Sequence, residues 1–219
     1  MIETDGRRLK GDASRRHVLD HAVDLASVEG LDGLSIGRLA EAAHVSKSGV
    51  ATLFGTKERL QLAAVEAARL RFVASVIEPA RVEPRGIVRI VALLDGWIAY
   101  SRDRVFAGGC FFAGVTSEFD TKPGPVRDAL AVALAEWNGY IAASFGFAIA
   151  QGEVGPDEDP AQFAFEATAL LDAANTRSLL DGSNQPYVFA RRALVTRLRS
   201  AGADDALLAR LAEVDDLVA

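Results

Sequence analysis

The segment LSIGRLAEAAHVSKSGVATLFGTK, residues 34–57, decides the fold of this chain. It predicts two short helices joined by a tight turn and followed directly by the start of a third helix. Ser35 and Ser46 are good N-caps for the two short helices, and Thr56 is one for the third, since a side-chain hydroxyl can accept an N–H of the first helical turn. Leu34, just before the first cap, can pack on Leu39 as a hydrophobic staple. Helices this short, with so little chain between them, must cross steeply, as in a helix-turn-helix unit.

The second short helix begins with Ser46, Lys47, Ser48 and Gly49, which are all small or basic. A helix start that offers hydroxyls, a cation and free backbone N–H groups suits the phosphates lining a DNA groove. Helix-turn-helix proteins place their second helix in the major groove in this orientation. An ordinary helical corner with polar caps is the alternative interpretation, because short motifs also match by chance.

The run VLDHAVDLASVEGLDGLSIGRLAEAAHVSKSGVATLFGTKERL, residues 18–60, resembles the DNA-binding domain of the TetR family of bacterial transcriptional regulators. The similarity holds in register, without a gap, over roughly residues 14–60. Its matching pieces are Ala22…Leu25…Gly30, Leu34-Ser35-Ile36, Leu39-Ala40, Val45-Ser46-Lys47 and Phe54-Gly55-Thr56-Lys57. Further on, GGCFFAGVTSEFDTKPGPVRDAL, residues 108–130, resembles one branch of the ligand-binding domains of this family.

The resemblance implies a DNA-binding transcriptional regulator, most simply a ligand-responsive repressor that binds a pseudo-palindromic operator as a homodimer. It also implies which residues contact double-stranded DNA: Ser35, Arg38, Ser46, Lys47, Ser48, Gly49, Thr52 and Lys57. The chain departs from the family pattern at Ala51 and Leu53, where relatives often carry Tyr and His that grip phosphates. A helical small-molecule-binding or interaction module with a weakened DNA-binding head is therefore the alternative.

The expected fold is all-α, with a helix-turn-helix domain of three helices and a C-terminal helical domain. Residues 1–13 are expected to form a disordered arm, residues 14–57 the DNA-binding domain, and residues 58–219 the ligand-binding and dimerisation domain. Apolar periodicity and Pro/Gly breaks predict the later helices. Their expected ranges are about 57–78, 85–103, 110–119, 125–151, 160–180, 186–200 and 204–218.

Aromatic residues are concentrated in the middle of the chain, where the resemblance implies a pocket for a small apolar or weakly polar effector. Such pockets are mostly apolar with a few polar anchors. The expected lining is Trp97, Tyr100, Phe111, Phe112, Thr116, Phe119, Trp137, Asn138, Ile141 and Asn175. For any single one of these aromatic residues, an ordinary helical core is favoured over contact with a ligand.

Composition places the chain among globular proteins: 219 residues, half of them hydrophobic, and a formal net charge of −6. There is no apolar run of transmembrane length and no apolar leader, and Cys110 has no second cysteine to pair with, so we expect a cytoplasmic protein without membrane contact. No motif of catalysis, phosphate-loop binding or zinc ligation is present. An enzyme is the least favoured alternative, and we expect no cofactor, metal site or catalytic residue.

Overall fold

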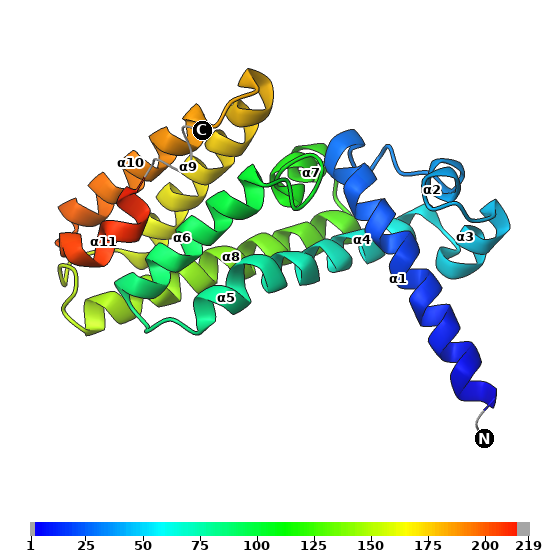
Figure 1. Ribbon diagram of the computed structural model, residues 1–219, viewed down its shortest axis with the longest axis horizontal. Coiled ribbons are helices and arrows are strands. Elements are labelled where there is room, and N and C mark those ends of the chain that lie inside the picture. The colour runs from blue at the N-terminus through cyan, green and yellow to red at the C-terminus, as the bar shows by residue number, and fades with distance from the viewer. Residues whose placement is uncertain (1–2, 214–219) are drawn as a thin grey trace. The chain divides into compact units, whose positions relative to one another are not determined.

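The computed structural model describes residues 3–213, with the side chains of the first helix described from residue 13 onward. This part of the chain is helical and contains no strand, as the sequence predicts (Figure 1). In chain order the helices are α1 (Glu3–Glu29), α2 (Ile36–Ala42), α3 (Lys47–Phe54), α4 (Lys57–Phe72), the π-helical turn η1 (Val73–Ile77), α5 (Glu78–Arg81), α6 (Ile87–Arg102), α7 (Phe111–Phe119), α8 (Pro125–Ala150), α9 (Pro160–Asp181), α10 (Gln185–Ser200) and α11 (Asp205–Ala212).

Contacts between residues divide the chain into two compact units. Unit 1 comprises Met1–Leu70 and Phe106–Leu130, and unit 2 comprises Arg71–Val105 and Ala131–Ala219. Helices α4 and α8 each supply one end to each unit. This division differs from the functional domains expected from sequence, because α7 joins the compact unit of the helix-turn-helix. The domain limits at residues 57 and 58 remain a prediction.

Helix α1 carries the apolar stripe that braces the helix-turn-helix. Val18, Ala22 and Ala26 are buried, and Gly30 ends the helix with a φ of +80°, a backbone conformation that glycine adopts readily. The prediction of a disordered arm is wrong for residues 3–13, because α1 begins at Glu3 rather than after Ser14. Apolar periodicity is absent from this N-terminal stretch, so no local pattern predicts a helix there.

Side-chain caps begin three successive helices of unit 1 where the sequence predicts them. The hydroxyl of Ser35 accepts the N–H of Arg38 at 3.3 Å, and that of Ser46 accepts the N–H of Gly49 at 3.1 Å. The hydroxyl of Thr56 accepts the N–H of Arg59 at 3.2 Å. Each cap satisfies a backbone donor that has no partner inside its helix.

The helix that begins at Lys57 continues past Pro79, although the sequence predicts its end at about Glu78. Between α4 and α5 the backbone widens into η1, where the N–H of Glu78 donates to the carbonyl of Val73. A proline ring inside an α-helix clashes with the carbonyl four residues earlier. The wider turn displaces that carbonyl, so the helix accommodates Pro79 near the start of α5.

Unit 2 is built on long helices, of which α9 and α10 lie side by side and are joined by Gly182–Asn184 (Figure 1). Phe145 of α8 stacks on Phe163 of α9 with ring centroids 4.1 Å apart. The C-terminal helix expected over 204–218 is α11 as far as Ala212, and the predicted residues from 214 onward lie outside the described part of the chain. None of the described helices combines the length and the apolar character needed to span a membrane.

Candidate DNA-binding face

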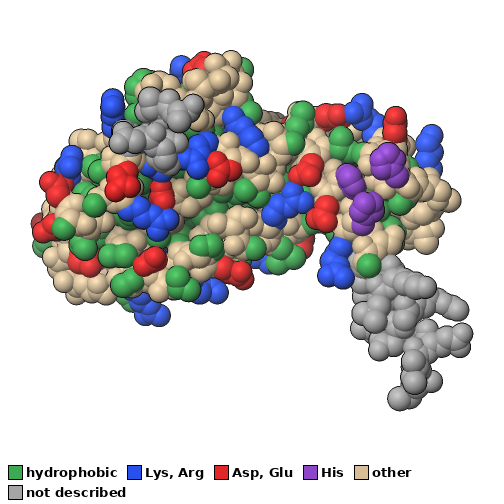
Figure 2. Space-filling view, viewed as in Figure 1, with side chains coloured by type: hydrophobic (Ala, Val, Ile, Leu, Met, Phe, Trp, Pro, Cys, Tyr) green, Lys and Arg blue, Asp and Glu red, His purple; other side chains and the backbone are tan. Residues whose placement is uncertain are grey.

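The turn between α2 and α3 has a closed backbone. His44 adopts a φ of +54°, and the N–H of Val45 donates to the carbonyl of Ala40 at 2.9 Å. From α1, Nε2 of His17 lies 3.0 Å from the carbonyl oxygen of Ala43, and its ring packs edge-on against His21. Histidine side chains gather accordingly on one face of unit 1 (Figure 2). Helix α1 therefore fixes the turn that sets the crossing of α2 and α3.

The first turn of α3 presents the predicted DNA contacts to solvent. Ser46, Lys47, Ser48 and Thr52 are exposed. The hydroxyl oxygens of Ser46 and Ser48 lie 3.1 Å apart, and Thr52 donates its hydroxyl to the carbonyl of Ser48 at 2.8 Å. These hydroxyl oxygens retain lone pairs, and one of the two serine hydroxyls can still donate, so the helix start remains able to meet a polar surface.

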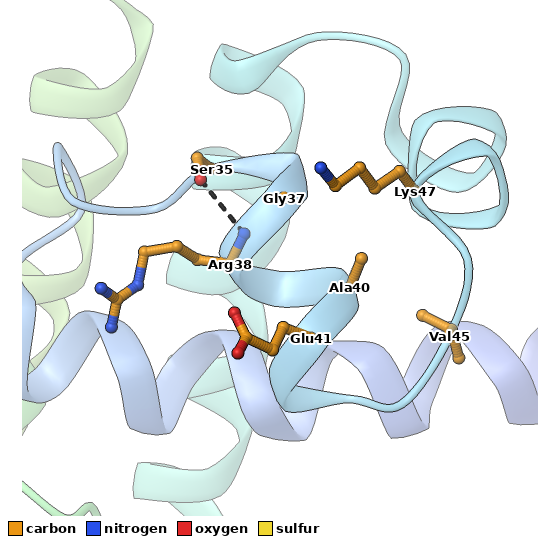
Figure 3. Close-up of a pocket in the computed structure, with 7 residues that line it drawn as sticks. All are labelled: Ser35, Gly37, Arg38, Ala40, Glu41, Val45 and Lys47. Atoms are coloured by element: carbon orange, nitrogen blue, oxygen red, sulfur yellow. Dashed lines mark hydrogen bonds between the residues drawn. The ribbon is translucent and has the colours of Figure 1, made fainter.

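Two open grooves flank this helix start. The first, of about 580 Å³, is lined by Ser35, Arg38 and Lys47 together with Gly37, Ala40, Glu41 and Val45. Figure 3 shows the Lys47 side chain reaching across it toward the start of α2. A Cβ on Gly37 would lie 3.9 Å from Nζ of Lys47. The second groove, of about 370 Å³, lies between α1 and α3 and includes Ser46, Ser48, Gly49 and Thr52.

The cations of this face differ in how strongly they are already compensated. Arg38 forms an ion pair with Glu29. Lys57 donates to the backbone carbonyl of Asp32 at 2.6 Å, with the Asp32 carboxylate 3.9 Å away. Lys47 has no ion pair with any residue that the structure describes. Of the three cations predicted to contact DNA, Lys47 is therefore the one whose charge is least offset.

Asp32 also pairs with Lys122, whose Nζ lies 2.6 Å from its Oδ2. The hydrogen bond from Lys122, aided by the charges of Lys122 and Lys57, holds the pKa of the Asp32 carboxyl below its ordinary value. The carboxylate thus stays ionised and keeps Lys57 beside it. A phosphate contact from Lys57 must compete with this arrangement.

Helix α7 is fastened to the end of α1 by contacts that the sequence did not reveal. The carboxylate of Glu118 accepts the backbone N–H groups of Leu31 and Asp32 at 3.2 and 3.0 Å. The N–H of Gly108 donates to the hydroxyl of Ser27 at 2.9 Å. A Cβ added to Gly108 would lie 1.9 Å from the carbonyl oxygen of Ser27, so this approach requires glycine.

Arg15 is a second contact that sequence reasoning missed. Its Nη1 donates to the carbonyl of Leu53 at 3.0 Å, and its guanidinium lies 4.7 Å from the centre of the Phe54 ring. A cation at the C-terminal end of α3 is favoured by the helix dipole. Arg15 and Leu53 are 38 positions apart in the sequence, so no local sequence pattern predicts their contact.

The residues expected to line an effector pocket fall into both units and are described separately. In unit 1, Phe111, Phe112 and Phe119 of α7 are buried, and Thr116 donates its hydroxyl to the carbonyl of Phe112 at 2.6 Å. The ring centroids of Phe106 and Phe111 are 5.6 Å apart. In unit 1 these aromatic side chains therefore contribute to a packed core.

In unit 2, Trp97, Tyr100 and Trp137 are buried, and the ring of Phe72 meets those of Tyr100 and Trp137 edge-on. Ile141 is buried as well. Two amide candidates are engaged within the protein: Asn138 accepts from Thr168 at 2.9 Å, and Asn175 accepts from Ser101 at 2.8 Å. The effector pocket remains a prediction, with an apolar character stronger than the sequence suggested.

Two family models match the chain. One, described as bacterial regulatory proteins of the tetR family, matches residues 18–64, which include α2 and α3. The other, described as a tetracyclin repressor-like C-terminal domain, matches residues 86–194. No curated protein matches the chain.

Solved structures with the same fold include a TetR transcriptional regulator from Chloroflexus aurantiacus J-10-FL. It is 26% identical, with 87% of this chain and 96% of the other covered and a TM-score of 0.77. A putative TetR-family transcriptional regulator from Rhodococcus sp. is 25% identical, with 86% and 98% covered and a TM-score of 0.68. A TetR-family regulator from Cytophaga hutchinsonii is 20% identical, with 88% and 96% covered and a TM-score of 0.76.

Proposed function

Because the chain belongs to the TetR family of bacterial regulatory proteins, we propose that it is a repressor that binds a pseudo-palindromic operator as a homodimer and releases it when an effector binds. The observation that carries the DNA-binding part is the exposed start of α3, where Lys47 borders a groove with Ser35 and no described carboxylate pairs with it. Such a helix start favours phosphate through its backbone N–H groups, its hydroxyls and its charge.

The dimer is supported by apolar side chains that α9 and α10 leave in solvent. Leu180 is 78% exposed and Phe165 69% exposed on α9, and Phe189 is 60% exposed on α10. Exposed apolar side chains gathered on two neighbouring helices are typical of a protein interface. A two-fold dimer presents two identical α3 helices, which call for two related half-sites in DNA.

Effector binding is supported by the aromatic side chains of unit 2, since Asn138 and Asn175 there are already hydrogen-bonded within the protein. We expect an apolar or weakly polar effector whose affinity comes mainly from buried surface. It must prefer a conformation that binds DNA poorly, because equal affinity for both conformations would shift nothing.

Fluorescence anisotropy with DNA from upstream of the protein's own coding sequence, over a series of salt concentrations, tests this function. Lys47→Ala should reduce the slope of log affinity against log salt by about one unit per phosphate contact, and so by about two for a dimer. Arg199→Ala is the matched control, because it removes one exposed positive charge from α10 and should leave the slope unchanged. Full-chain protein that binds no DNA would instead indicate the small-molecule-binding or interaction module.

A further inference from the structure

Three arginines of unit 2 gather at one cleft. They follow one another at every fourth position: Arg81 ends α5, Arg85 lies in the connection, and Arg89 is in the first turn of α6. The cleft has a volume of about 260 Å³, and its other wall comes from α8 through Tyr140, Ala143, Ser144 and Phe147. No residue of this cleft belongs to the DNA-binding face.

Two of the three guanidinium groups, those of Arg85 and Arg89, have contacts within unit 2. Nη2 of Arg89 donates to the carbonyl oxygens of Arg81 and Glu83 at 3.0 and 2.6 Å, and its Nε donates to Glu83 at 3.2 Å. The guanidinium carbon of Arg85 lies 4.5 Å from the centre of the Phe147 ring. Arg89 therefore closes the connection between α5 and α6, while the guanidinium of Arg85 lies over the ring of Phe147.

These three arginines have no carboxylate partner among the residues that the structure describes. Other arginines of unit 2 do: Arg197 pairs with Glu158 and Glu166, and Arg199 pairs with Asp205. In a protein with a net charge of −6, three guanidinium groups beside one cleft without a counter-ion form a local excess of positive charge. Such an excess attracts anions.

Neutral groups and one engaged carboxylate surround the three arginines. The start of α6 borders the cleft, and its cap residue Gly86 supplies no side-chain hydrogen bond. The carboxylate of Glu153 is engaged, since it accepts the N–H of Ile87 at 2.8 Å, and it does not line the cleft. Tyr140 adds a half-buried ring whose hydroxyl has no hydrogen-bond partner among the described residues.

We propose that this cleft binds the phosphate group of a small organic ligand, with a planar ring of that ligand lying against Tyr140 and Phe147. Guanidinium groups bind phosphate through parallel N–H···O bonds, which suits Arg81 and Arg85. Arg89 contributes charge and positions the loop. The volume admits a phosphate and a single ring, and thus selects a phosphorylated aromatic compound over a larger ligand.

Isothermal titration of the full-length protein with phenyl phosphate and, separately, with inorganic phosphate at constant ionic strength tests the proposal. Phenyl phosphate should bind at least tenfold more tightly than inorganic phosphate, because only the former offers a ring. Arg81→Ala and Arg85→Ala should each weaken phenyl phosphate at least tenfold. Phe147→Leu should weaken phenyl phosphate more than inorganic phosphate, because it removes the surface for the ligand ring as well as the support of Arg85.

Two matched variants separate this cleft from other basic surfaces. Arg192→Ala removes an exposed arginine of α10, and Lys47→Ala removes the cation of the DNA-binding face. Both should bind phenyl phosphate as the unmodified protein does. The proposal would be overturned by an equal loss of affinity in either control, or by no binding of either probe. It would also be overturned if Arg81→Ala and Arg85→Ala folded normally by circular dichroism and bound phenyl phosphate without loss.

Discussion

Hydrogen bonds from small polar side chains fix two regions of the molecule, but they span different distances in the chain. One region is the helix-turn-helix of unit 1, and the other comprises the helices α6, α9 and α10 of unit 2. In the first region the hydroxyls of Ser35 and Ser46 meet backbone groups only three residues away. In the second, the hydroxyl of Ser101 contacts Asn175 and Tyr187, which are 74 and 86 residues away.

The two regions also differ in solvent access. The caps of unit 1 are exposed, whereas Ser101, Asn175, Ser178 and Tyr187 are buried. Exposed hydrogen bonds exchange readily with water and contribute little, while a buried polar group left without a partner is costly. The local bonds therefore define where helices begin, and the distant bonds hold separate helices together.

The largest expected effect comes from breaking the buried network at Tyr187. Its hydroxyl lies 2.8 Å from that of Ser101 and accepts from Ser178 at 2.9 Å. Tyr187→Ala should lower the free energy of unfolding by about 3–5 kcal/mol, because it also leaves a cavity. Tyr187→Phe should cost about 1 kcal/mol, since Ser101 and Ser178 keep other partners. Urea unfolding at fixed protein concentration measures both, and equal costs would show that packing contributes nothing.

A smaller effect is expected from Asp172 on α9. Burial raises the pKa of this carboxyl to about 6, from 3.8. The folded state therefore disfavours the ionised form, so stability falls as pH rises from about 4 to about 6 and is constant above that. Asp172→Asn should raise the free energy of unfolding by up to about 3 kcal/mol at pH 7.

The gain from Asp172→Asn should shrink toward zero by pH 4, where the native carboxyl is protonated. Unfolding curves at pH 4, 5, 6 and 7 follow the change, with Asp181→Asn, an exposed position at the end of the same helix, as control. A gain independent of pH would mean that desolvation of this carboxylate is not its cause.

The smallest effect is expected from the local caps. Ser46→Ala should lower the free energy of unfolding by about 1 kcal/mol, and Ser46→Gly by only a few tenths. Ser117→Ala, at an exposed position inside α7, should be neutral or slightly stabilising, because alanine favours helix. If thermal and urea unfolding showed Ser46→Ala to cost as much as Tyr187→Ala, the contrast between the two regions would be lost.

This contrast also explains what could be predicted from the sequence. Caps at Ser35, Ser46 and Thr56 and the stop at Gly30 depend on neighbouring residues, so a local pattern reveals them. The fastening of α7 by Glu118 joins residues 87 positions apart and leaves no such pattern.

The predicted site residues show the same contrast between local patterns and contacts made far along the chain. Lys47 lies at an exposed helix start, as its position after a cap indicates. Asn138 and Asn175 were expected to face an effector, yet their hydrogen bonds go to Thr168 and Ser101. A polar residue in an apolar helix has the same signature whether it meets a ligand or another helix, so the sequence does not distinguish the two roles.

The π-helical turn η1 has a consequence for changes in chain length. A turn closed by an i→i+5 bond holds about one residue more than an α-helical turn. Deletion of one residue within Val73–Ile77 would therefore leave α4 and α5 in their original rotational phase, whereas deletion elsewhere in α4 would rotate all that follows. Such a deletion would also return an α-helical carbonyl to the ring of Pro79, so a tolerated shortening of η1 would require the proline to be replaced as well.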